Sequence, residues 1–495
     1  MDKTTITTLG ELKKSGYQPK GIKDELRDNL ITNLRKGVNV FEGIHGFEYS
    51  VIPDLERAIL SGHNINFLGL RGQAKTRMAR MMVKLLDEYV PAITGSELAD
   101  DPMMPLSRTA LEIIAEKGDD TPIYWIHRDE RYYEKLATPD VTVADLIGDV
   151  DPIKAANLKL SFADERVIHF GMIPRANRSI FVINELPDLQ ARIQVALFNI
   201  LQEGDIQIRG FKLRLNLDIQ FVFTANPEDY TNRGSIVTPL KDRIGSQILT
   251  HYPEDIETAR KITEQEAKLK TVQTDTIAIP DVARDLLEQI AFEARENEYI
   301  DAKSGVSARL TITALENLVS TAERRMLVSG SEKTTVRLLD FLGIVPAITG
   351  KVELVYEGEQ EGSAMVAENL IGSAVKTLIE DFLPTLDNIK SSDAQNPYNE
   401  LVEWFSKGNS IDLLTDASDG EYQRTLDSIK PMERFLKNNL PDGYESDSRY
   451  FIMEMVLWAL AEHSKLNKER LVAGFNFSDL FSSYLRGGDL DLGVN

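Results

Sequence analysis

The 495-residue sequence contains no cysteine and no long apolar run. The absence of cysteine excludes disulfide bonds, cysteine-ligated zinc, iron–sulfur clusters and a thiol nucleophile. A membrane-spanning helix needs about 18 or more consecutive apolar residues, so we expect no such helix and no membrane partner. The segment from Met1 to Thr5 has no basic stretch followed by an apolar one, so a signal peptide is not expected. These absences favour a cytoplasmic protein.

Positive charge is also scarce. The chain has 56 Lys and Arg residues against 78 Asp and Glu residues, which gives a formal net charge of −22. Such an excess argues against a protein that holds nucleic acid along much of its surface. The excess is largest over residues 331–495, where a solvated acidic surface is the ordinary interpretation and a docking face for a basic partner is the alternative.

Two common kinds of catalytic centre are missing from the sequence as well. There is no Gly-x-Ser-x-Gly motif, which is the usual setting of a serine nucleophile in one large class of hydrolases. None of the six histidines pairs with another histidine or a carboxylate at a convincing metal-ligand spacing. The histidines are therefore expected to be structural or exposed.

Short apolar runs alternate with helical patterns up to about residue 255, which predicts a parallel α/β sheet. The expected strands are 64–68, 123–127, 179–184, 220–225 and 248–252. Two hairpins are expected, at 167–173 and 206–217. Beyond residue 255 the pattern is helical, apart from one expected strand at 352–356. The helices expected there are 255–269, 281–297, 307–328, 334–342, 365–382, 397–407, 421–438 and 448–464.

Gly69-x-x-Gly72-x-x-Lys75-Thr76 has the spacing of a phosphate-binding loop between a strand and a helix. Loop amides and the helix N-terminus attract the β-phosphate. Lys75 is expected to reach the β- and γ-phosphates, and the Thr76 hydroxyl to ligate Mg²⁺. Ala74 stands where a glycine is usual. The alternative is an ordinary strand-to-helix turn with a surface lysine.

A second motif follows the expected strand 179–184, which ends in Asn184-Glu185. Glu185 is a candidate general base that orients the attacking water. Asn184 stands where Asp is usual; its amide oxygen accepts a hydrogen bond from a metal-bound water but adds no charge, so Mg²⁺ binding should be weaker. The alternative is a strand end at which Glu185 stabilises a helix dipole.

A third strand ends in Ala225-Asn226-Pro227. Asn226 is a candidate to bind the attacking water or the γ-phosphate. Asn-Pro alone is a weak signal, because it is common in turns. The order along the chain, in which the loop lysine is followed by the glutamate and then by the asparagine, strengthens the assignment of Asn226 to the site.

At these motifs the sequence resembles the AAA+ ATPases, and among them the MoxR and magnesium-chelatase ATPase-subunit group, over about residues 40–330. Alanine precedes the loop lysine in the MoxR form, so Ala74 fits this group, whereas Asn184 departs from it. The segment 176–186 is similar to the chelatase stretch that leads into the Walker B strand. The resemblance implies the following nucleotide-binding residues: Ile44, Gly46, Gly69, Gly72, Gln73, Ala74, Lys75 and Thr76.

The resemblance also implies functional roles for two arginines. Arg243, in a segment similar to the family's Leu-Asp-Arg-Phe, would be the arginine finger offered to a neighbouring subunit, with Arg233 as a rival. Arg309 follows Gly305-Val306-Ser307-Ala308 and would be the sensor 2 arginine of the lid. For each of the two, an ordinary surface arginine is the alternative.

The fold class implied is α/β: a P-loop AAA+ parallel sheet flanked by helices, then a helical lid and a mostly helical C-terminal domain. The expected divisions are an N-terminal extension at 1–25, the nucleotide-binding domain at 26–255, the lid at 256–345 and an acidic domain at 346–495. An arginine finger acting between subunits requires an oligomer, and the family usually forms hexameric rings.

The implied function is hydrolysis of ATP with Mg²⁺ to remodel a partner, which in relatives is a von Willebrand A-domain protein. A non-hydrolysing, ATP-responsive scaffold is the alternative, motivated by Asn184. A transcription activator is disfavoured, because the sequence lacks a Gly-Ala-Phe-Thr-Gly-Ala loop and a basic helix-turn-helix. No nucleic-acid partner is therefore expected.

Overall fold

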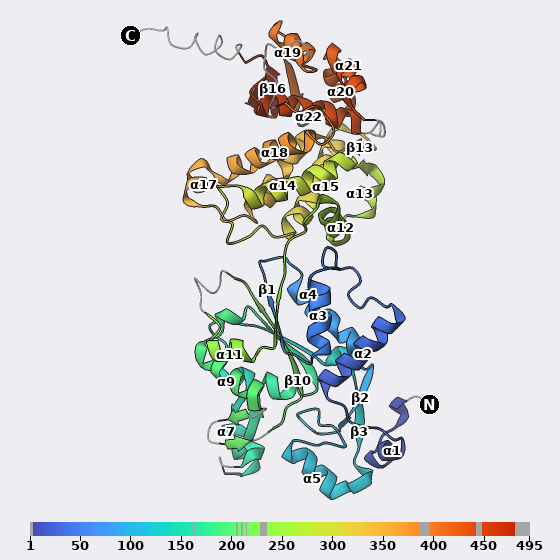
Figure 1. Ribbon diagram of the computed structural model, residues 1–495, viewed down its shortest axis with the longest axis vertical. Coiled ribbons are helices and arrows are strands. Elements are labelled where there is room, and N and C mark those ends of the chain that lie inside the picture. The colour runs from blue at the N-terminus through green and yellow to red at the C-terminus, as the bar shows by residue number, and fades with distance from the viewer. Residues whose placement is uncertain are drawn as a thin grey trace. The chain divides into compact units, whose positions relative to one another are not determined.

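The computed structural model divides the chain into two compact units, Met1–Tyr252 and Pro253–Asn495 (Figure 1). The residues that it describes are 3–161, 164–203, 206–208, 211–213, 215–227, 235–386, 396–441 and 448–480. Among the described helices, none combines the length and the apolar character that crossing a lipid bilayer requires.

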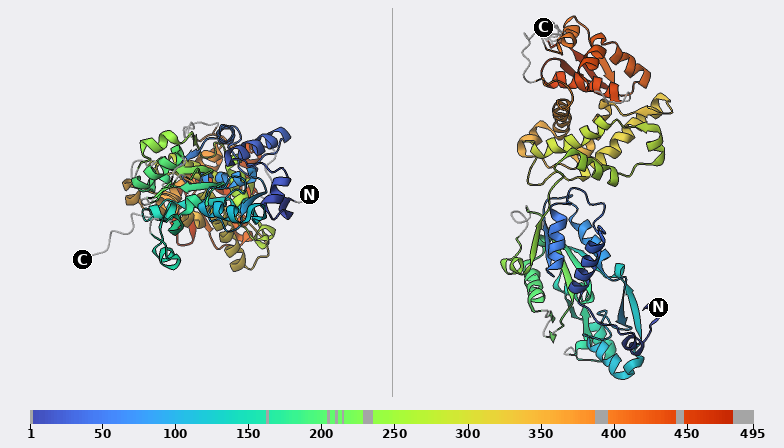
Figure 2. Two further views of the ribbon diagram at one scale, coloured as in Figure 1. Left: turned by 90° about the horizontal axis from the view of Figure 1, so that it is seen from below. Right: turned by 45° about the vertical axis from the view of Figure 1, so that its right-hand side comes forward.

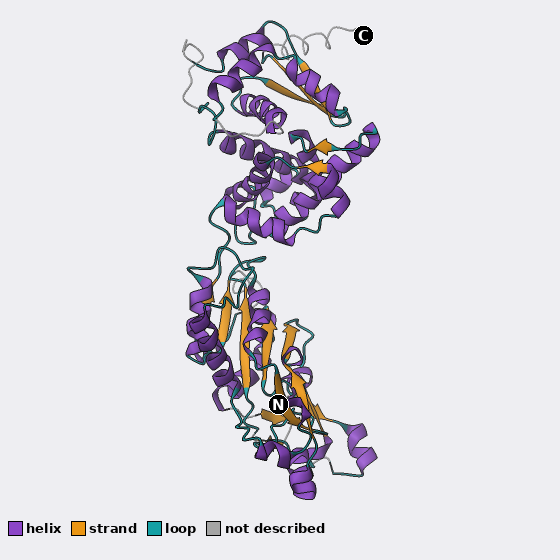
Figure 3. Cartoon of the chain, turned by 90° about the vertical axis from the view of Figure 1, so that its right-hand side faces the viewer, coloured by secondary structure: helices purple, strands orange, loops and turns teal. Residues whose placement is uncertain are grey.

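The first unit is built on a five-stranded sheet in the order β11-β1-β10-β7-β4, with every neighbouring pair parallel (Figure 3). Every residue of β7 and β10 is buried, as expected for central strands of a parallel sheet covered on both faces. The strands are β1 (Ile65–Leu68), β4 (Tyr132–Leu136), β7 (Ser179–Asn184), β10 (Ile219–Ala225) and β11 (Ser246–Leu249).

Helices cover the two faces of this sheet, and alternate residues of β7 point to opposite sides. Ile180 and Val182 join the core beneath α2 (Ile22–Lys36), α3 (Val51–Leu60) and α4 (Lys75–Met81). Phe181 and Ile183 join the core beneath α9 (Ala191–Glu203). Figure 1 shows α9 and α11 (Thr238–Arg243) on one side of β1 and β10, and α2 to α4 on the other.

Smaller elements surround this sheet. β2 (Tyr89–Ile93) and β3 (Ile123–His127) pair antiparallel, as do β5 (Gly148–Val150) with β6 (Ile168–Phe170), and β8 (Ile206–Ile208) with β9 (Phe211–Leu213). The short helices are α1 (Leu9–Lys14), α5 (Arg108–Lys117), α6 (Val143–Leu146), α7 (Pro152–Leu158) and α8 (Met172–Arg175).

The hairpin expected at 167–173 is wrong, whereas the one at 206–217 is present as β8 and β9. Strand β6 pairs with β5, from a stretch in which the sequence predicts no element. A Cβ atom at Gly171 would lie 2.5 Å from the carbonyl carbon of Leu146 and 2.6 Å from the amide nitrogen of Ile147. Glycine is therefore needed there for a close backbone approach and not for a turn.

The second unit has one continuous hydrophobic core, whose buried members run from Ile277 to Phe477. The right-hand view of Figure 2 shows its yellow, orange and red segments stacked in one body. The helices are α12 (Ile256–Glu266), α13 (Thr271–Thr276), α14 (Asp281–Glu296), α15 (Arg309–Ser329), α16 (Val345–Thr349), α17 (Tyr356–Glu361), α18 (Ser363–Ile379), α19 (Asn399–Ser406), α20 (Asp419–Asp427), α21 (Lys430–Asn439) and α22 (Arg449–Glu462).

Helix α22 is unusual because every residue from Phe451 to Leu460 is buried. It contacts α18, α20 and β15. An antiparallel sheet in the order β14-β16-β15 and a parallel pair complete the unit. These strands are β12 (Ile277–Ala278), β13 (Thr334–Thr335), β14 (Ile411–Leu414), β15 (Asn467–Leu471) and β16 (Gly474–Ser478).

The strand expected at 352–356 is not formed. Leu354 makes a single bridge to Ile300, and α17 begins at Tyr356. The expected helix 334–342 is replaced by β13 and a 3-10 helix, Leu338–Ile344.

Candidate nucleotide-binding site

The phosphate-binding loop lies between β1 and α4, as expected. The amide of Gly69 donates to the carbonyl of Ala225 at 3.1 Å, and the amide of Thr250 donates to the carbonyl of Leu68 at 2.9 Å. The first of these bonds ties the loop to β10, and the second ties the end of β1 to the segment after β11. A Cβ atom at Gly69 would collide with the side chains of Thr250 and Gln73. Only glycine therefore fits where the loop leaves the strand.

Two further loop residues have left-handed backbone conformations. Gly72 has φ of 76° and Ala74, directly before α4, has φ of 52°. Glycine adopts this region freely, whereas a residue with a Cβ atom pays about 1–2 kcal/mol. Ala74 thus keeps the backbone turn that a glycine usually makes, at some cost in strain.

Lys75 is the first residue of α4 and is 8% exposed. Its Nζ atom donates to the carbonyl of Leu70 at 2.9 Å and also to the carbonyl of Gly69. The ammonium group therefore lies folded back over the loop, at the helix N-terminus where an anion is favoured.

The side chain of Asn184, at the end of β7, connects this loop to the sheet. Its Oδ1 atom accepts hydrogen bonds from the hydroxyls of Thr76 and Thr224, both at 3.1 Å. Its Nδ2 atom donates to Oε1 of Glu134, on β4, at 2.7 Å. Because a carboxylate can only accept, the amide orientation is fixed by its partners.

The other oxygen of Glu134 is also occupied. Oε2 accepts from Arg80 Nη2 at 2.8 Å and from the Tyr132 hydroxyl at 3.0 Å. The Glu134 carboxylate raises the pKa of Arg80, and burial together with Glu134 raises the pKa of Tyr132. Both neighbours therefore remain protonated donors at neutral pH.

Glu185 and Asn226 follow neighbouring parallel strands at the same edge of the sheet. Glu185 has φ of 55°, and its amide donates to the Thr224 hydroxyl at 3.1 Å. Asn226 is 3% exposed, and its Oδ1 atom has no hydrogen-bond partner among the described residues. A buried acceptor without a partner is uncommon and indicates a place for a water molecule or a ligand.

The turn that carries Ile44 and Gly46 lies between α2 and α3. Ile44 is 6% exposed, and Gly46 has φ of 81°. Just after this turn, the ring of Phe47 lies edge-on to the ring of His251, with centroids 5.0 Å apart. The Ser50 hydroxyl lies 2.8 Å from Nε2 of His251.

The segment 250–252 joins that turn to the phosphate-binding loop. The Thr250 hydroxyl donates to Oε1 of Gln73 at 2.7 Å, and the Tyr252 hydroxyl donates to the carbonyl of Arg71 at 2.9 Å. These residues, with Glu134 and Thr224, were not predicted from the sequence. Each is a single polar residue far along the chain from its partner, so no local pattern marks it.

The two arginines implied by the resemblance lie in different units. Arg243 ends α11 with its side chain 39% exposed, in contact with Asp242, Gln202 and the ring of Phe198. Arg309 is the exposed first residue of α15, in the second unit. Contact of either guanidinium with nucleotide stays a prediction, and Arg233 lies outside the described residues.

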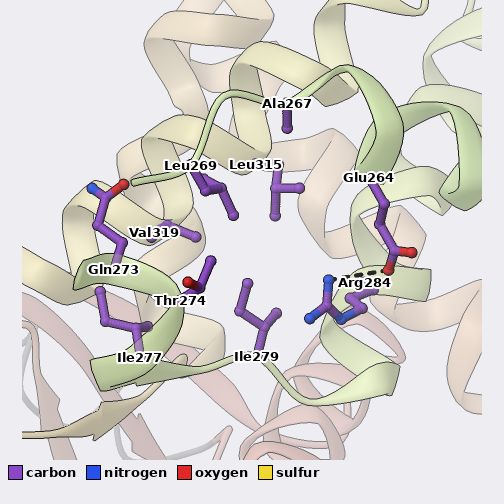
Figure 4. Close-up of a pocket in the computed structure, with 10 residues that line it drawn as sticks. All are labelled: Glu264, Ala267, Leu269, Gln273, Thr274, Ile277, Ile279, Arg284, Leu315 and Val319. Carbon is purple, nitrogen blue, oxygen red and sulfur yellow. Dashed lines mark hydrogen bonds and ion pairs between the residues drawn. The ribbon is translucent and has the colours of Figure 1, made fainter. Parts of the chain in front are cut away.

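A pocket of about 320 Å³ lies in the second unit, between α12, α13 and α15 (Figure 4). Leu269, Ile279 and Leu315 point into it, and Glu264 pairs with Arg284 at its edge. No residue of the phosphate-binding loop lines it. Within the described part of the chain there is also no cluster of three or more His, Asp or Glu residues that could hold a metal ion by itself.

The parallel sheet and the loop between β1 and α4 give the first unit the fold of a P-loop AAA+ module. A family model described as the Sigma-54 interaction domain matches residues 157–245, which include Asn184, Glu185, Asn226 and Arg243. The magnesium-chelatase 38 kDa subunit of Cereibacter sphaeroides is 24% identical to this chain over 203 residues, or 40% of this chain. The match covers 54% of that protein, so the chain spans about half the length of this relative.

Solved structures give a weaker likeness. One chain in a complex of subunits BchI and BchD of magnesium chelatase is 17% identical to this chain, with a TM-score of 0.32. The match covers 69% of this chain and 96% of that chain. NtrX from Brucella abortus is 14% identical, with a TM-score of 0.37, covering 70% of this chain and 66% of that chain. The family match and the curated relative nevertheless confirm the resemblance to AAA+ ATPases of the MoxR and magnesium-chelatase group.

Proposed function

We propose that this chain is a Mg²⁺-dependent AAA+ ATPase that binds and hydrolyses ATP in a ring oligomer to remodel a partner protein. One observation carries the proposal: Lys75, Thr76, Asn184, Glu185 and Asn226 meet at one edge of the sheet, at the end of β1, β7 and β10. These residue types are the ones that phosphoryl transfer to water requires.

The donors present suit Mg²⁺, which prefers hard oxygen ligands and keeps several of its waters. The Thr76 hydroxyl and the Asn184 amide oxygen lie 3.1 Å apart, so Thr76 would bind the ion directly and Asn184 through a water. When bound, the ion would neutralise charge on the β- and γ-phosphates.

The remaining residues have distinct roles in this proposal. Lys75 would bind the β- and γ-phosphates, and Glu185 would take the proton of the attacking water as general base. The unpartnered oxygen of Asn226 would accept a hydrogen bond from the same water. Ile44 and Gly46 would pack against the adenine.

Hydrolysis would also require groups from outside this edge. Arg243, which is partly exposed on α11, would stabilise transition-state charge in the neighbouring subunit, and Arg309 would act from the lid. An arginine that acts in a neighbouring subunit requires an oligomer. We propose a hexameric ring, with a von Willebrand A-domain protein as its partner by analogy with the family.

The test is steady-state hydrolysis of ATP with Mg²⁺ by the wild type, Lys75→Ala and Glu185→Gln, with the exposed Lys36→Ala as the matched control. We expect Lys75→Ala to lose both nucleotide binding and turnover. Glu185→Gln should keep binding but lose turnover by about 10²- to 10⁴-fold. Tight nucleotide binding by a wild type without turnover, even in the presence of its partner, would favour the non-hydrolysing scaffold instead.

The match to the Sigma-54 interaction domain raises a transcription activator as a second candidate. The acidic charge and the missing Gly-Ala-Phe-Thr-Gly-Ala loop speak against it. A DNA titration at two salt concentrations decides between them, because specific binders hold DNA tightly and with a steep salt dependence. We expect neither behaviour.

A further inference from the structure

Asn184 is uncharged, although an aspartate is usual at this position. We propose that Glu134, on the neighbouring strand β4, supplies the negative charge for Mg²⁺ that Asn184 lacks. Glu134 would act as a positioning residue, through the Asn184 amide and a metal-bound water. This inference rests on the MgATP site proposed above.

The register of the sheet brings the two side chains together. Strands β4 and β7 pair with Glu134 opposite Val182 and Leu136 opposite Asn184. Side chains two residues apart on a strand share a face, so Glu134, Val182 and Asn184 all lie on the face that α4 covers. Asn184 and Glu134 lie diagonally across the two strands, and Asn184 Nδ2 donates a hydrogen bond of 2.7 Å to Glu134 Oε1.

Helix α4 meets this pair with two side chains one turn apart. Thr76 and Arg80 are four residues apart and therefore lie on one face of the helix. Thr76 bonds to Asn184, and Arg80 pairs with Glu134. The proposed metal ligand and the carboxylate are thus joined by two hydrogen bonds through a single amide.

The same geometry explains why position 184 carries an amide. An aspartate there would face the carboxylate of Glu134 at hydrogen-bond distance, and two like charges that close repel. An asparagine instead donates to Glu134 and still presents its oxygen toward Thr76. The negative charge that an aspartate would place at the end of β7 is therefore carried by Glu134, one strand away on β4.

Arg80 does not cancel this role. It contacts Oε2 of Glu134, whereas Asn184 contacts Oε1, and its own side chain is 64% exposed. Although Arg80 donates to Oε2 from both Nε and Nη2, its guanidinium is open to water, which screens its charge. Glu134 therefore keeps negative charge directed at the amide.

The test uses the full chain and the fluorescent nucleotide N-methylanthraniloyl-ADP, titrated in EDTA and over a range of Mg²⁺ concentrations. For Glu134→Gln we expect unchanged affinity in EDTA and an apparent Mg²⁺ affinity lowered by about tenfold, the lower end of the effect of losing a partner of a metal ligand. Glu112→Gln, which alters an exposed ion pair with Arg108, is the matched control.

Two further variants distinguish charge from structure. The exchanged pair Glu134→Gln with Asn184→Asp reverses the hydrogen bond and keeps one carboxylate, so it should recover most of the lost Mg²⁺ affinity. Arg80→Gln removes only the ion pair and should leave Mg²⁺ affinity undiminished. If Arg80→Gln instead weakens Mg²⁺ binding as much as Glu134→Gln does, the role of Glu134 is to hold α4 and the inference is wrong.

The outcomes also separate this inference from the function on which it rests. A wild type that binds no nucleotide in either buffer overturns both. A wild type that binds nucleotide, with the same Mg²⁺ dependence in Glu134→Gln, overturns the inference alone. Thermal unfolding of each variant shows whether a loss of binding is a loss of folding.

Discussion

The Thr76 hydroxyl donates a hydrogen bond of 3.1 Å to Oδ1 of Asn184, which joins the first turn of α4 to the end of β7. The same oxygen accepts from Thr224 on β10. One amide oxygen thus connects three elements of the proposed site, the helix after the loop and two central strands.

Thr76→Val removes this hydroxyl with little change in shape. We expect it to leave nucleotide affinity in EDTA unchanged and to lower the apparent Mg²⁺ affinity by about tenfold or more, since a hydrogen bond or contact to a charged group contributes about 1.5–3 kcal/mol. Fluorescent nucleotide binding across Mg²⁺ concentrations measures this. Equal loss in EDTA and in Mg²⁺ would mean that Thr76 acts on the loop and not on the metal.

Gly69→Ala should damage the phosphate-binding loop, because the new methyl group would collide with Thr250 and Gln73, whose side chains are bonded to each other. Overpacking of this kind costs about 1–3 kcal/mol. We expect a lower unfolding temperature and weaker nucleotide binding. The control is Gly420→Ala, where nothing lies within 4 Å of the added atom; it should bind nucleotide like the wild type.

Ala74→Gly should be neutral or stabilising by up to about 1 kcal/mol, because Ala74 has φ of 52°, a conformation that glycine adopts freely. Ala79→Gly, in the fully buried interior of α4, should be destabilising by about 1 kcal/mol or more. Denaturant unfolding of both variants compares them. The same sign for both would contradict the strain at Ala74.

Glu454→Gln should change how stability depends on pH. Burial raises the pKa of Glu454 to about 7, against a bond of 2.7 Å from the Tyr422 hydroxyl that lowers it. A folded pKa above the unfolded value of 4.5 means that the wild type loses stability as pH rises from about 4.5 to 7. A neutral glutamine avoids that loss.

The measurement is the free energy of unfolding of the second unit at pH 5 and pH 8. The gain of Glu454→Gln over the wild type should be about 2–3 kcal/mol larger at pH 8 than at pH 5. The exposed Glu332→Gln serves as the control and should behave alike at both values. A pH-independent effect of Glu454→Gln would show that Glu454 ionises normally.

The sequence predicted the fold class, which is confirmed, and placed the phosphate-binding loop between its strand and helix. Both rest on local patterns. The buried strands β7 and β10 are continuous apolar runs, and the loop is a spacing of eight residues. Each of these patterns lies within a short stretch of consecutive residues and does not depend on contacts with distant parts of the chain.

What the sequence did not predict depends on distant partners. Strand β4 reads Tyr-Tyr-Glu-Lys-Leu and lies at the edge of the sheet, so it has no apolar run that would reveal it in the sequence. The bonds from Thr250 to Gln73 and from Asn184 to Glu134 join residues 177 and 50 positions apart. Two polar residues so far apart along the chain produce no periodic pattern by which the sequence would reveal their contact.

The burial of helix α22 affects how the nascent chain folds during synthesis. It is buried on every side from Phe451 to Leu460, and part of its cover comes from later residues: Trp458 packs edge-on against Phe475 of β16, with ring centroids 5.1 Å apart. During synthesis the apolar helix leaves the ribosome before this cover exists. A nascent chain in that state exposes apolar surface and is prone to aggregate, so we expect α22 to need protection, for example by a chaperone, until β16 has formed.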